Sequence, residues 1–302
     1  MERNCYFFTH FTGEHDIGEQ VYFSLSRDGM HFEDMNGGLP VLVSEIGERG
    51  VRDPFILRSE IDGCFYIIAT DLRIANGKGW GVAQEAGSLN IVIWKSEDLV
   101  HWSEPWMFDT AVPDAGCVWA PEAAYDHNRD AYLVFWASKI KNPDGVGRKQ
   151  KIYRAYTRDF VEFTEPKLYI ERGSDVIDTT IVTEGGRFYR FSKDEVTKRI
   201  VLDCGHDLVG EFHDIPCAAL ESLPGVEGPI AYKLHDGTWC LLVDQFAKGA
   251  GYLPLFSRDI SSGVFEIMDK HDYDMGKTKK RHGGILAITE EEYDRVRDAF
   301  GK

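Results

Sequence analysis

The stretch VRDPFILRSEIDGCFYIIATD, residues 51–71, and its continuation to Trp102 contain the pattern from which the fold is predicted. It begins with Val-Arg-Asp-Pro and places two apolar runs on either side of Asp62-Gly63. Asp-Gly between two β-rich runs is the signal of a tight hairpin. A third apolar run, 89–94, leads into Ser-Glu-Asp-Leu-Val-His-Trp, whose aromatic end we interpret as a short fourth strand. The stretch therefore predicts a four-stranded antiparallel sheet.

The same order of segments recurs along the chain. New units begin near Trp119, Ile177 and Val226, and the N-terminus supplies the later part of another unit. The closing motif contains an aspartate in each unit: Asp28, Asp98, Asp159, Asp207 and Asp259, at spacings of 70, 61, 48 and 52 residues. Repeats of about 40 to 50 residues with four strands each are typical of a β-propeller. The fold class predicted is all-β, a five-bladed β-propeller, with an open stack of β-meanders or a sandwich as the alternative.

The two ends of the chain each supply part of one unit. The N-terminal unit lacks an opening strand, and residues 282–288 form one spare strand, so we expect the two ends to share a blade and close the ring. Residues 289–300 are the one convincing helix, with Thr289 and Glu292 in capping-box spacing, and we expect it to pack against the barrel side. Two long connections, 71–88 and 139–151, are interpreted as loops, and long loops on a rigid scaffold often line sites.

Composition narrows the class of protein and partner. The 302 residues contain no linker, so we expect a single catalytic domain over 1–302. The net charge of −16 and the lack of a Lys/Arg run argue against a nucleic-acid partner. No run approaches about 18 apolar residues, and the N-terminus has no signal-like segment, so we expect a cytoplasmic protein without a membrane partner. The six cysteines lie mostly in apolar runs, which favours reduced core thiols over disulfides or zinc ligands.

Four carboxylates open the repeated units: Asp53, Glu122, Asp178 and Glu227. The first strand of a propeller blade is innermost, and all first strands run the same way along the axis. These acids are therefore expected to converge on one end of the channel. Like charges raise one another's pKa when buried, so an ordinary core does not gather them, although acids that cap turns or bind a metal are the alternative. Clustered carboxylates in unequal environments suit glycosidic bond cleavage.

Three motifs, in this order and each opening a blade, resemble the signatures of glycoside hydrolase family 43: Arg52-Asp53-Pro54, Trp119-Ala120-Pro121-Glu122 and Glu227-Gly228-Pro229. The resemblance covers nearly the whole chain. It implies a five-bladed propeller among inverting enzymes, mainly α-L-arabinofuranosidases, β-xylosidases and arabinanases. It also implies that Asp53 is the general base and Glu227 the general acid. Glu122 falls where the family usually has an Asp that tunes the acid's pKa.

The other candidate site residues have less specific signals. Trp119 could offer an apolar platform to a sugar or pack within its blade. Asp178 could hold a sugar hydroxyl or a cation, and Arg190, Lys193 and Arg281 could orient either one or simply be exposed charges. His282 falls near the place where the family often holds a central calcium or water, so a structural calcium on the axis is an expectation beside an ordinary hydrogen-bonded histidine. No cofactor is required for the chemistry.

These observations predict an inverting, exo-acting glycoside hydrolase that acts on a small oligosaccharide. The first expectation is an α-L-arabinofuranosidase acting on arabinose-containing oligosaccharides, with a β-xylosidase or exo-galactosidase as alternatives. A phosphorylase on a similar scaffold would need a cationic phosphate cluster beside one acid. A non-catalytic carbohydrate-binding propeller would not need both an acid and a base. The sequence does not determine the sugar or the oligomeric state.

Overall fold

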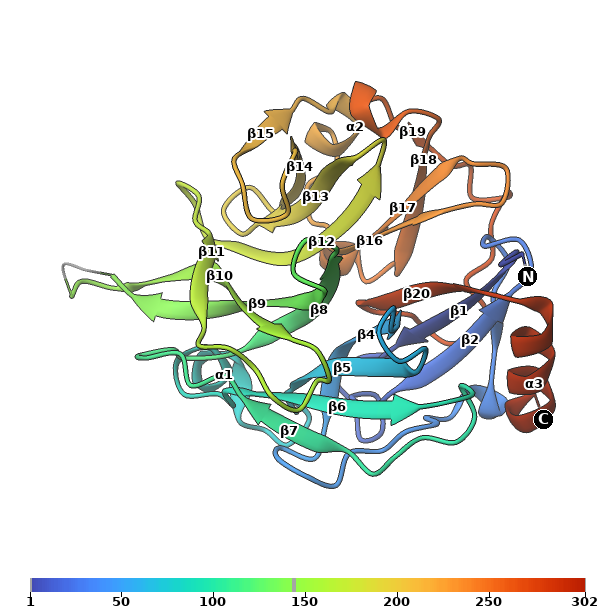
Figure 1. Ribbon diagram of the computed structural model, residues 1–302, viewed down its shortest axis with the longest axis horizontal. Coiled ribbons are helices and arrows are strands. Elements are labelled where there is room, and N and C mark those ends of the chain that lie inside the picture. Colours follow the sequence, from blue (N-terminus) through green and yellow to red (C-terminus); the bar gives the residue numbers. More distant parts are fainter. Residues whose placement is uncertain (1, 143–144, 302) are drawn as a thin grey trace.

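Five four-stranded antiparallel sheets surround a central axis (Figure 1), which confirms the predicted five-bladed β-propeller. The computed structural model describes residues 2–142 and 145–301. In each sheet the strand nearest the axis contacts the corresponding strand of the next blade, and these five strands form the channel wall. Blade by blade, from the innermost strand outward, the elements are as follows: β20 (Gly283–Ile288), β1 (Cys5–His10), β2 (Tyr22–Ser26), β3 (Glu33–Asp34); β4 (Val51–Arg58), β5 (Phe65–Asp71), β6 (Asn90–Ser96), β7 (Trp106–Asp109); β8 (Trp119–Asp126), β9 (Ala131–Lys141), β10 (Arg148–Thr157), β11 (Lys167–Ile170); β12 (Val176–Glu184), β13 (Arg187–Asp194), β14 (Arg199–Gly205), β15 (Phe212–Ile215); β16 (Glu227–Lys233), β17 (Trp239–Asp244), β18 (Tyr252–Ser257), β19 (Glu266–Ile267).

The ring closes by pairing the two ends of the chain, as predicted. Strand β20 pairs antiparallel with β1, from Cys5 opposite Ile288 to His10 opposite Gly283. Helix α3 (Glu290–Phe300) follows at once and lies on the outer side of this blade, next to both termini (Figure 1). Its predicted capping box is present, because the Thr289 hydroxyl accepts from the Glu292 N–H and the Glu292 carboxylate accepts from the Thr289 N–H.

The core lies between the blades and is rich in aromatic side chains. Phe7, Phe23 and Trp94, for example, are at most 1% exposed in the cluster between the first two blades. Burying a side chain of this size contributes roughly 1.5 to 3 kcal/mol, so the inter-blade clusters are the main source of stability. All six cysteines are free thiols, as predicted, and four of them are buried.

The repeated closing motif forms a turn, so its interpretation as a fourth strand was wrong. Oδ1 of Asp98 accepts hydrogen bonds from the N–H groups of Val100 (2.9 Å) and His101 (2.8 Å). Asp28 and Asp159 do the same in their own units. A short carboxylate that bonds the backbone just after it favours a turn over a strand. The true fourth strands begin later, as β7 does at Trp106.

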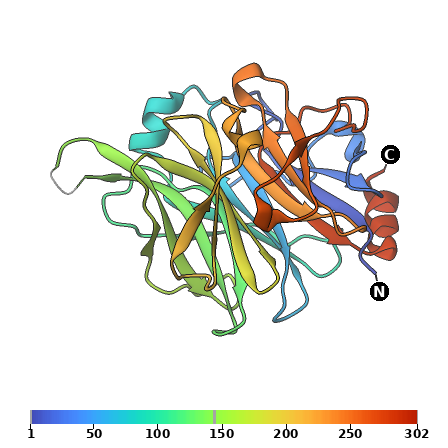
Figure 2. The same ribbon diagram turned by 90° about the horizontal axis from the view of Figure 1, so that it is seen from above.

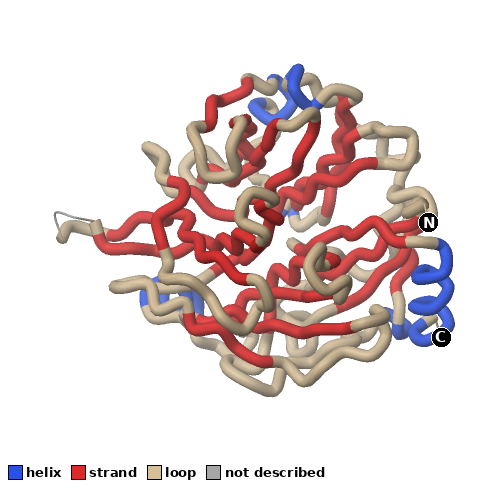
Figure 3. The backbone as a smooth tube through the Cα atoms, viewed as in Figure 1, coloured by secondary structure: helices blue, strands red, loops and turns tan. Residues whose placement is uncertain are grey.

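Helices also occur where loops were predicted. Helix α1 (Gly79–Glu85) lies within the 71–88 connection, at one end of the ring (Figure 2), and α2 (Ala218–Glu221) is a single short turn, so α3 is not the one helix. Helices occupy the periphery of the β-ring (Figure 3). None within residues 2–142 and 145–301 is long and apolar enough to cross a membrane.

The 139–151 connection is largely a hairpin. Strand β9 runs to Lys141 and β10 begins at Arg148, and the two pair in register. The surface-loop prediction was therefore wrong for these flanks, and positions 143 and 144 lie outside the described residues.

Candidate active site

Four of the innermost strands share an irregularity near the same end of the channel. In β4, β8, β12 and β16 the pairing register shifts after the first residues, and one residue at each shift has a positive φ. These residues are Asp53 (52°), Ala120 (46°), Asp178 (47°) and Gly228 (52°). Bulges of this kind re-aim side chains and are frequent beside active sites, and left-handed backbone at a non-glycine residue is a strained state that the surrounding fold must hold.

The bulge register separates the four predicted carboxylates along the channel. Asp53 and Asp178 occupy the bulge position itself, Glu227 precedes the bulge residue of its strand by one, and Glu122 follows its own by two. Asp53, Asp178 and Glu227 line one pocket of about 580 Å³. Glu122 does not line it and instead borders a second cavity of about 250 Å³ further along the channel. Convergence on one end is thus correct for three acids and wrong for Glu122.

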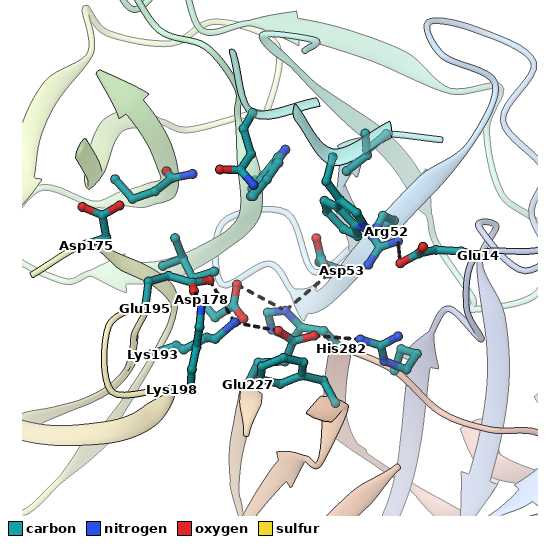
Figure 4. A pocket seen from close by; sticks show the side chains of 18 of the residues that line it. Glu14, Arg52, Asp53, Asp175, Asp178, Lys193, Glu195, Lys198, Glu227 and His282 are labelled. Carbon is teal, nitrogen blue, oxygen red and sulfur yellow. Dashed lines mark hydrogen bonds and ion pairs between the residues drawn. The ribbon is translucent and has the colours of Figure 1, made fainter. Parts of the chain in front are cut away.

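The pocket has walls from all around the ring. Figure 4 shows Arg52 and Glu14 on one side, the Lys193, Glu195 and Lys198 group on the other, and His282 with Glu227 between them. The remaining lining residues are Asp53, Leu72, Trp80, Gln84, Trp119, Gln150, Asp175, Ile177, Asp178, Val196, Phe246 and Arg281.

Asp53 is held as a proton acceptor. The Thr70 hydroxyl donates to its Oδ2 at 2.8 Å, and Nδ1 of His282 lies 3.4 Å from its Oδ1. Burial raises the pKa of Asp53, but the hydrogen bond to His282 and the charge of that ring outweigh burial and lower it below the ordinary value. At neutral pH Asp53 is therefore ionised and able to take a proton from water.

Glu227 is held between two cations. Its Oε2 lies 2.7 Å from Nζ of Lys193 and its Oε1 lies 2.7 Å from Nη2 of Arg281. Arg281 in turn binds the fully buried Asp244. Burial raises the pKa of Glu227, but the charges of Lys193 and Arg281 lower it below the ordinary value.

Asp178 is the carboxylate next to Glu227. It is 7% exposed, and its Oδ2 accepts a hydrogen bond from the Gly228 N–H at 3.1 Å. Burial raises its pKa; His282 and Lys193 oppose this, and the negative charge of Glu227 adds to it. The two acids therefore influence each other's protonation at the start of strand β16.

His282 occupies the axis between the carboxylates. Its ring lies 3.4 Å from Asp53, 3.9 Å from Asp178 and 4.0 Å from Glu122. Burial lowers the pKa of His282, but the hydrogen bond to Asp53 and the negative charges around it raise the pKa to about 9. A Cβ on Gly228 would lie 2.8 Å from the Cβ and Cγ of His282, so only glycine lets the ring sit here.

The donors around His282 do not fit a calcium ion. Among residues 2–142 and 145–301, no group of three or more His, Cys, Asp or Glu side chains is arranged to hold a metal. The nearby carboxylates contact the imidazole, whose raised pKa makes it the cation of this cluster.

Comparison with known families identifies the family of this chain. Residues 2–294 match a family model related to glycoside hydrolase family 43 and described as a probable glycosyl hydrolase domain. The chain belongs to this family of glycosyl hydrolases. An α-L-arabinofuranosidase from Bifidobacterium longum subsp. longum is 33% identical over 203 residues, which is 61% of this chain and 19% of that protein. The chain thus spans a small part of that relative.

Solved structures of family 43 hydrolases share the fold at low identity. An endo-1,4-β-xylanase from Bacteroides thetaiotaomicron superposes with a TM-score of 0.56 at 13% identity, covering 93% of both chains. A family 43 protein from Bacillus licheniformis gives a TM-score of 0.55 at 17% identity, covering 83% of this chain and 46% of that one. An exo-β-1,3-galactanase from Phanerochaete chrysosporium gives 0.53 at 13% identity, covering 72% and 49%. These likenesses establish the propeller.

Of the site residues predicted from less specific signals, some line the hydrolase pocket and one lies within a blade. Trp119 lines the pocket, with its ring edge-on to Trp80 at 5.8 Å, and Arg281 lines it beside Glu227. Arg190 does not. It makes two 2.8 Å hydrogen bonds to Asp203 and lies 3.4 Å from the Phe212 ring, so its predicted contact with substrate was wrong and its role is to brace the fourth blade.

Several pocket residues of this hydrolase were missed by sequence reasoning. Trp80 and Gln84 come from α1, Gln150 from β10, and Glu195 and Lys198 from the β13–β14 turn. The length of the 71–88 connection was a usable signal, because it pointed to a site-lining loop. Nothing in the local sequence marked Glu195 or Lys198, which join the site through Lys193, the side chain of the same hairpin that reaches Glu227 of the next blade.

Proposed function

We propose that this chain is an inverting, exo-acting glycoside hydrolase, with α-L-arabinofuranosidase activity on short arabinose-containing oligosaccharides. The observation that carries the proposal is the presence of Asp53 and Glu227 in one pocket, with different partners. A pocket blocked at its inner end by His282 suits removal of a terminal sugar residue. Inverting hydrolysis requires a base for water and an acid for the leaving oxygen on opposite sides of the sugar.

In the proposed reaction Asp53 takes a proton from water as its oxygen bonds to the anomeric carbon. The glycosidic C–O bond breaks at the same time, and Glu227 gives a proton to the leaving oxygen. Asp53 suits the base because its Thr70 and His282 partners stabilise the ionised form. Each turnover returns one proton from Asp53 to solvent and takes one up on Glu227, so the reaction balances.

We assign the tuning of Glu227 to Asp178 rather than to Glu122. Asp178 shares the pocket with Glu227 and bonds the backbone N–H of the next residue, Gly228. A negative charge here raises the pKa of Glu227 and opposes the two cations. Glu122 borders the other cavity, beyond His282.

The choice of arabinofuranose is supported by the relative named α-L-arabinofuranosidase. The alternatives are a β-xylosidase and an exo-galactosidase, because the structural neighbours include a xylanase and a galactanase.

The test is nitrophenol release from a panel of nitrophenyl α-L-arabinofuranoside, β-D-xyloside and β-D-galactoside, followed by proton NMR of the first product. We expect release from the arabinofuranoside with inversion of the anomeric configuration, and retention would refute the role of Asp53.

A phosphorylase is the second candidate, because Lys193, Lys198 and Arg281 form a cationic group beside Glu227. Each of these cations is already bound to a carboxylate, which favours hydrolysis over phosphate binding. Repeating the assay with inorganic phosphate separates the two, since a phosphorylase forms a sugar 1-phosphate. No release from any substrate, with sugar binding intact, would favour a non-catalytic binding propeller.

A further inference from the structure

In the resting pocket two cations hold Glu227 in its ionised form, which cannot donate a proton. Both carboxylate oxygens are occupied, Oε2 by Lys193 and Oε1 by Arg281, each at 2.7 Å. A general acid must carry a proton and direct it at the leaving oxygen. Two cations at hydrogen-bond distance favour the ionised form, so Glu227 takes up a proton more readily once one of them moves away.

Arg281 is the fixed partner. Its guanidinium binds Glu227 through Nη2 and Asp244 through Nε, and Asp244 is fully buried on β17. A planar guanidinium donates its hydrogen bonds in fixed directions, so Arg281 cannot move without breaking its bonds to the two carboxylates. Moving Arg281 would also leave the buried Asp244 without its cation, which is costly.

Lys193 has a second carboxylate within reach. Its Nζ lies 2.7 Å from Glu227 and 2.9 Å from Oε1 of Glu195, just beyond the end of its own strand, β13. Lys198 binds the other oxygen of Glu195 and so fixes that carboxylate at the rim (Figure 4). Lys193 is 2% exposed, and its ammonium lies 4.5 Å from the centre of the Phe246 ring. A flexible ammonium with two acceptors can exchange one for the other by a small movement.

We propose that Lys193 and Glu195 are positioning residues that release Glu227 when a sugar fills the pocket. The ammonium of Lys193 then stays on Glu195 alone, and Oε2 of Glu227 takes up a proton and faces the glycosidic oxygen. Arg281 keeps hold of Oε1 and sets the direction of the carboxyl. This inference rests on the proposed hydrolase function and adds a condition to it, because the acid becomes competent only with substrate present.

The charges that surround Glu227 come from several parts of the ring. They are Lys193 on β13, Lys198 just before β14, Arg281 before β20, Asp178 on β12, Asp244 on β17 and Arg52 on β4. Changing Lys193 or Glu195 leaves the other charged side chains in place, so the effects of the two changes can be compared against the same surroundings.

Two variants should shift the pKa of Glu227 in opposite directions. Lys193→Met removes a cation from Glu227, so the basic limb of the kcat/KM profile should move up by about one pH unit. Glu195→Gln removes the competing acceptor, so Lys193 holds Glu227 more firmly and the same limb should move down. A merely structural role would damage both variants alike, without opposite shifts.

The matched control is Lys233→Met, which breaks a Lys–Glu pair formed with Glu184 between the same two blades, in an exposed position. It should leave the profile unchanged. Shifts of the same sign for Lys193→Met and Glu195→Gln, or no shift in either, would overturn the inference.

A second measurement keeps the inference separate from the proposed function. Carbon-13 NMR of protein labelled at its glutamate carboxyls follows the titration of Glu227 directly, with Glu227→Gln assigning the signal. The pKa of Glu227 should be raised in Lys193→Met and lowered in Glu195→Gln even if no sugar in the panel is cleaved. An unmoved Glu227 signal in both variants refutes the positioning role, whereas opposite shifts without glycosidase activity refute only the proposed function.

Discussion

The same five strands form both ends of the channel of this propeller. The carboxylates at the two ends have different surroundings. At the pocket end, Asp53, Asp178 and Glu227 surround a space of about 580 Å³ with basic partners and aromatic walls. Further along, Glu122 borders a cavity of about 250 Å³ whose other lining residues are mainly apolar, with Arg3, Arg58 and Glu60 also lining it. Glu122 is 3% exposed, and burial raises its pKa to about 8 although the charge of His282 opposes this.

The difference shows that position along a strand, more than residue type, decides what an acid can do here. Glu122 and Glu227 each follow or precede a bulge residue, yet a displacement of three positions relative to the bulge takes one of them out of the pocket. The acids at the pocket end also differ from one another in their hydrogen-bonding partners. Asp53 has a hydroxyl and an imidazole, and Glu227 has two cations.

The largest effect is expected when the acid and base variants are compared on two substrates that differ in their leaving group. Glu227→Gln removes proton donation, which a sugar leaving group needs and dinitrophenolate hardly does. Activity on oligosaccharides should fall ~10² to 10⁴-fold, while much of it remains on the dinitrophenyl glycoside. Asp53→Asn removes the base that activates water and should impair both substrates. Steady-state kinetics on the two substrates measures this.

The contradicting outcomes are specific. Equal losses on both substrates for Glu227→Gln would remove it from the role of acid. Recovery of Asp53→Asn with the better leaving group would mean that Asp53 does not activate water.

A smaller effect should distinguish Asp178 from Glu122. Asp178→Asn removes the negative charge that raises the pKa of Glu227, so the basic limb of kcat/KM should move down and activity at neutral pH should fall ~10-fold or more. Glu122→Gln resembles the protonated acid, which is the main form of Glu122 below pH 8. It should leave the rate at pH 6 to 7 nearly unchanged. If Glu122→Gln shifts the limb and Asp178→Asn does not, the assignment must be reversed.

The blade count, the closure of the ring and the position of Asp53 and Glu227 at one end of the channel were predictable because each rests on a repeated local pattern. The position of Glu122 was not, because the bulges that set register appear only as positive φ values at Asp53, Ala120, Asp178 and Gly228. Aligning the acids by residue type assumed a common register that the strands do not have.

Residues whose position depends on packing between blades were also beyond sequence reasoning. Helix α1 contains Gly79 and Gly81, which weaken helix formation. Its contacts lie outside the local sequence: Ala83 is fully buried, and Glu85 binds Lys139 and Arg148 of the third blade at 2.9 Å. Arg190 looked like a site residue in the sequence, but its Asp203 partner on β14 holds it in the blade.

An aromatic platform occurs at the pocket end and gives the next prediction. Trp80 is 39% exposed at the rim, edge-on to Trp119, and the Arg52 guanidinium lies 4.8 Å from its ring centre. An exposed aromatic above a pocket suits contact with the leaving sugar rather than the buried one. Trp80→Ala should lower kcat/KM about 10-fold on oligosaccharides and leave a glycosyl fluoride unaffected, because fluoride has no sugar to stack.

The control for Trp80 is Val82→Ala on the same helix, since Val82 is 51% exposed and does not line the pocket. It should not change either rate. An equal loss on the fluoride for Trp80→Ala would place Trp80 against the cleaved sugar or in the support of the pocket.

The smallest effect concerns the other cavity and should appear in stability alone. The pKa of Glu122 is raised from its ordinary value of 4.5 to about 8, so between these values the folded protein binds a proton that the unfolded chain does not. The stability that this group contributes is full below about pH 4.5 and is lost as the pH rises towards 8. Glutamine does not titrate, so Glu122→Gln does not lose stability in this way. The melting temperature of the variant minus that of the parent should therefore increase by ~1 to 4 °C between pH 5 and pH 8. Glu184→Gln, at an exposed glutamate of β12, controls for the loss of one carboxylate. A difference for Glu122→Gln that stays constant with pH, or that reverses sign, would mean that Glu122 is ionised in the folded protein, and the contrast between the two ends of the channel would fail.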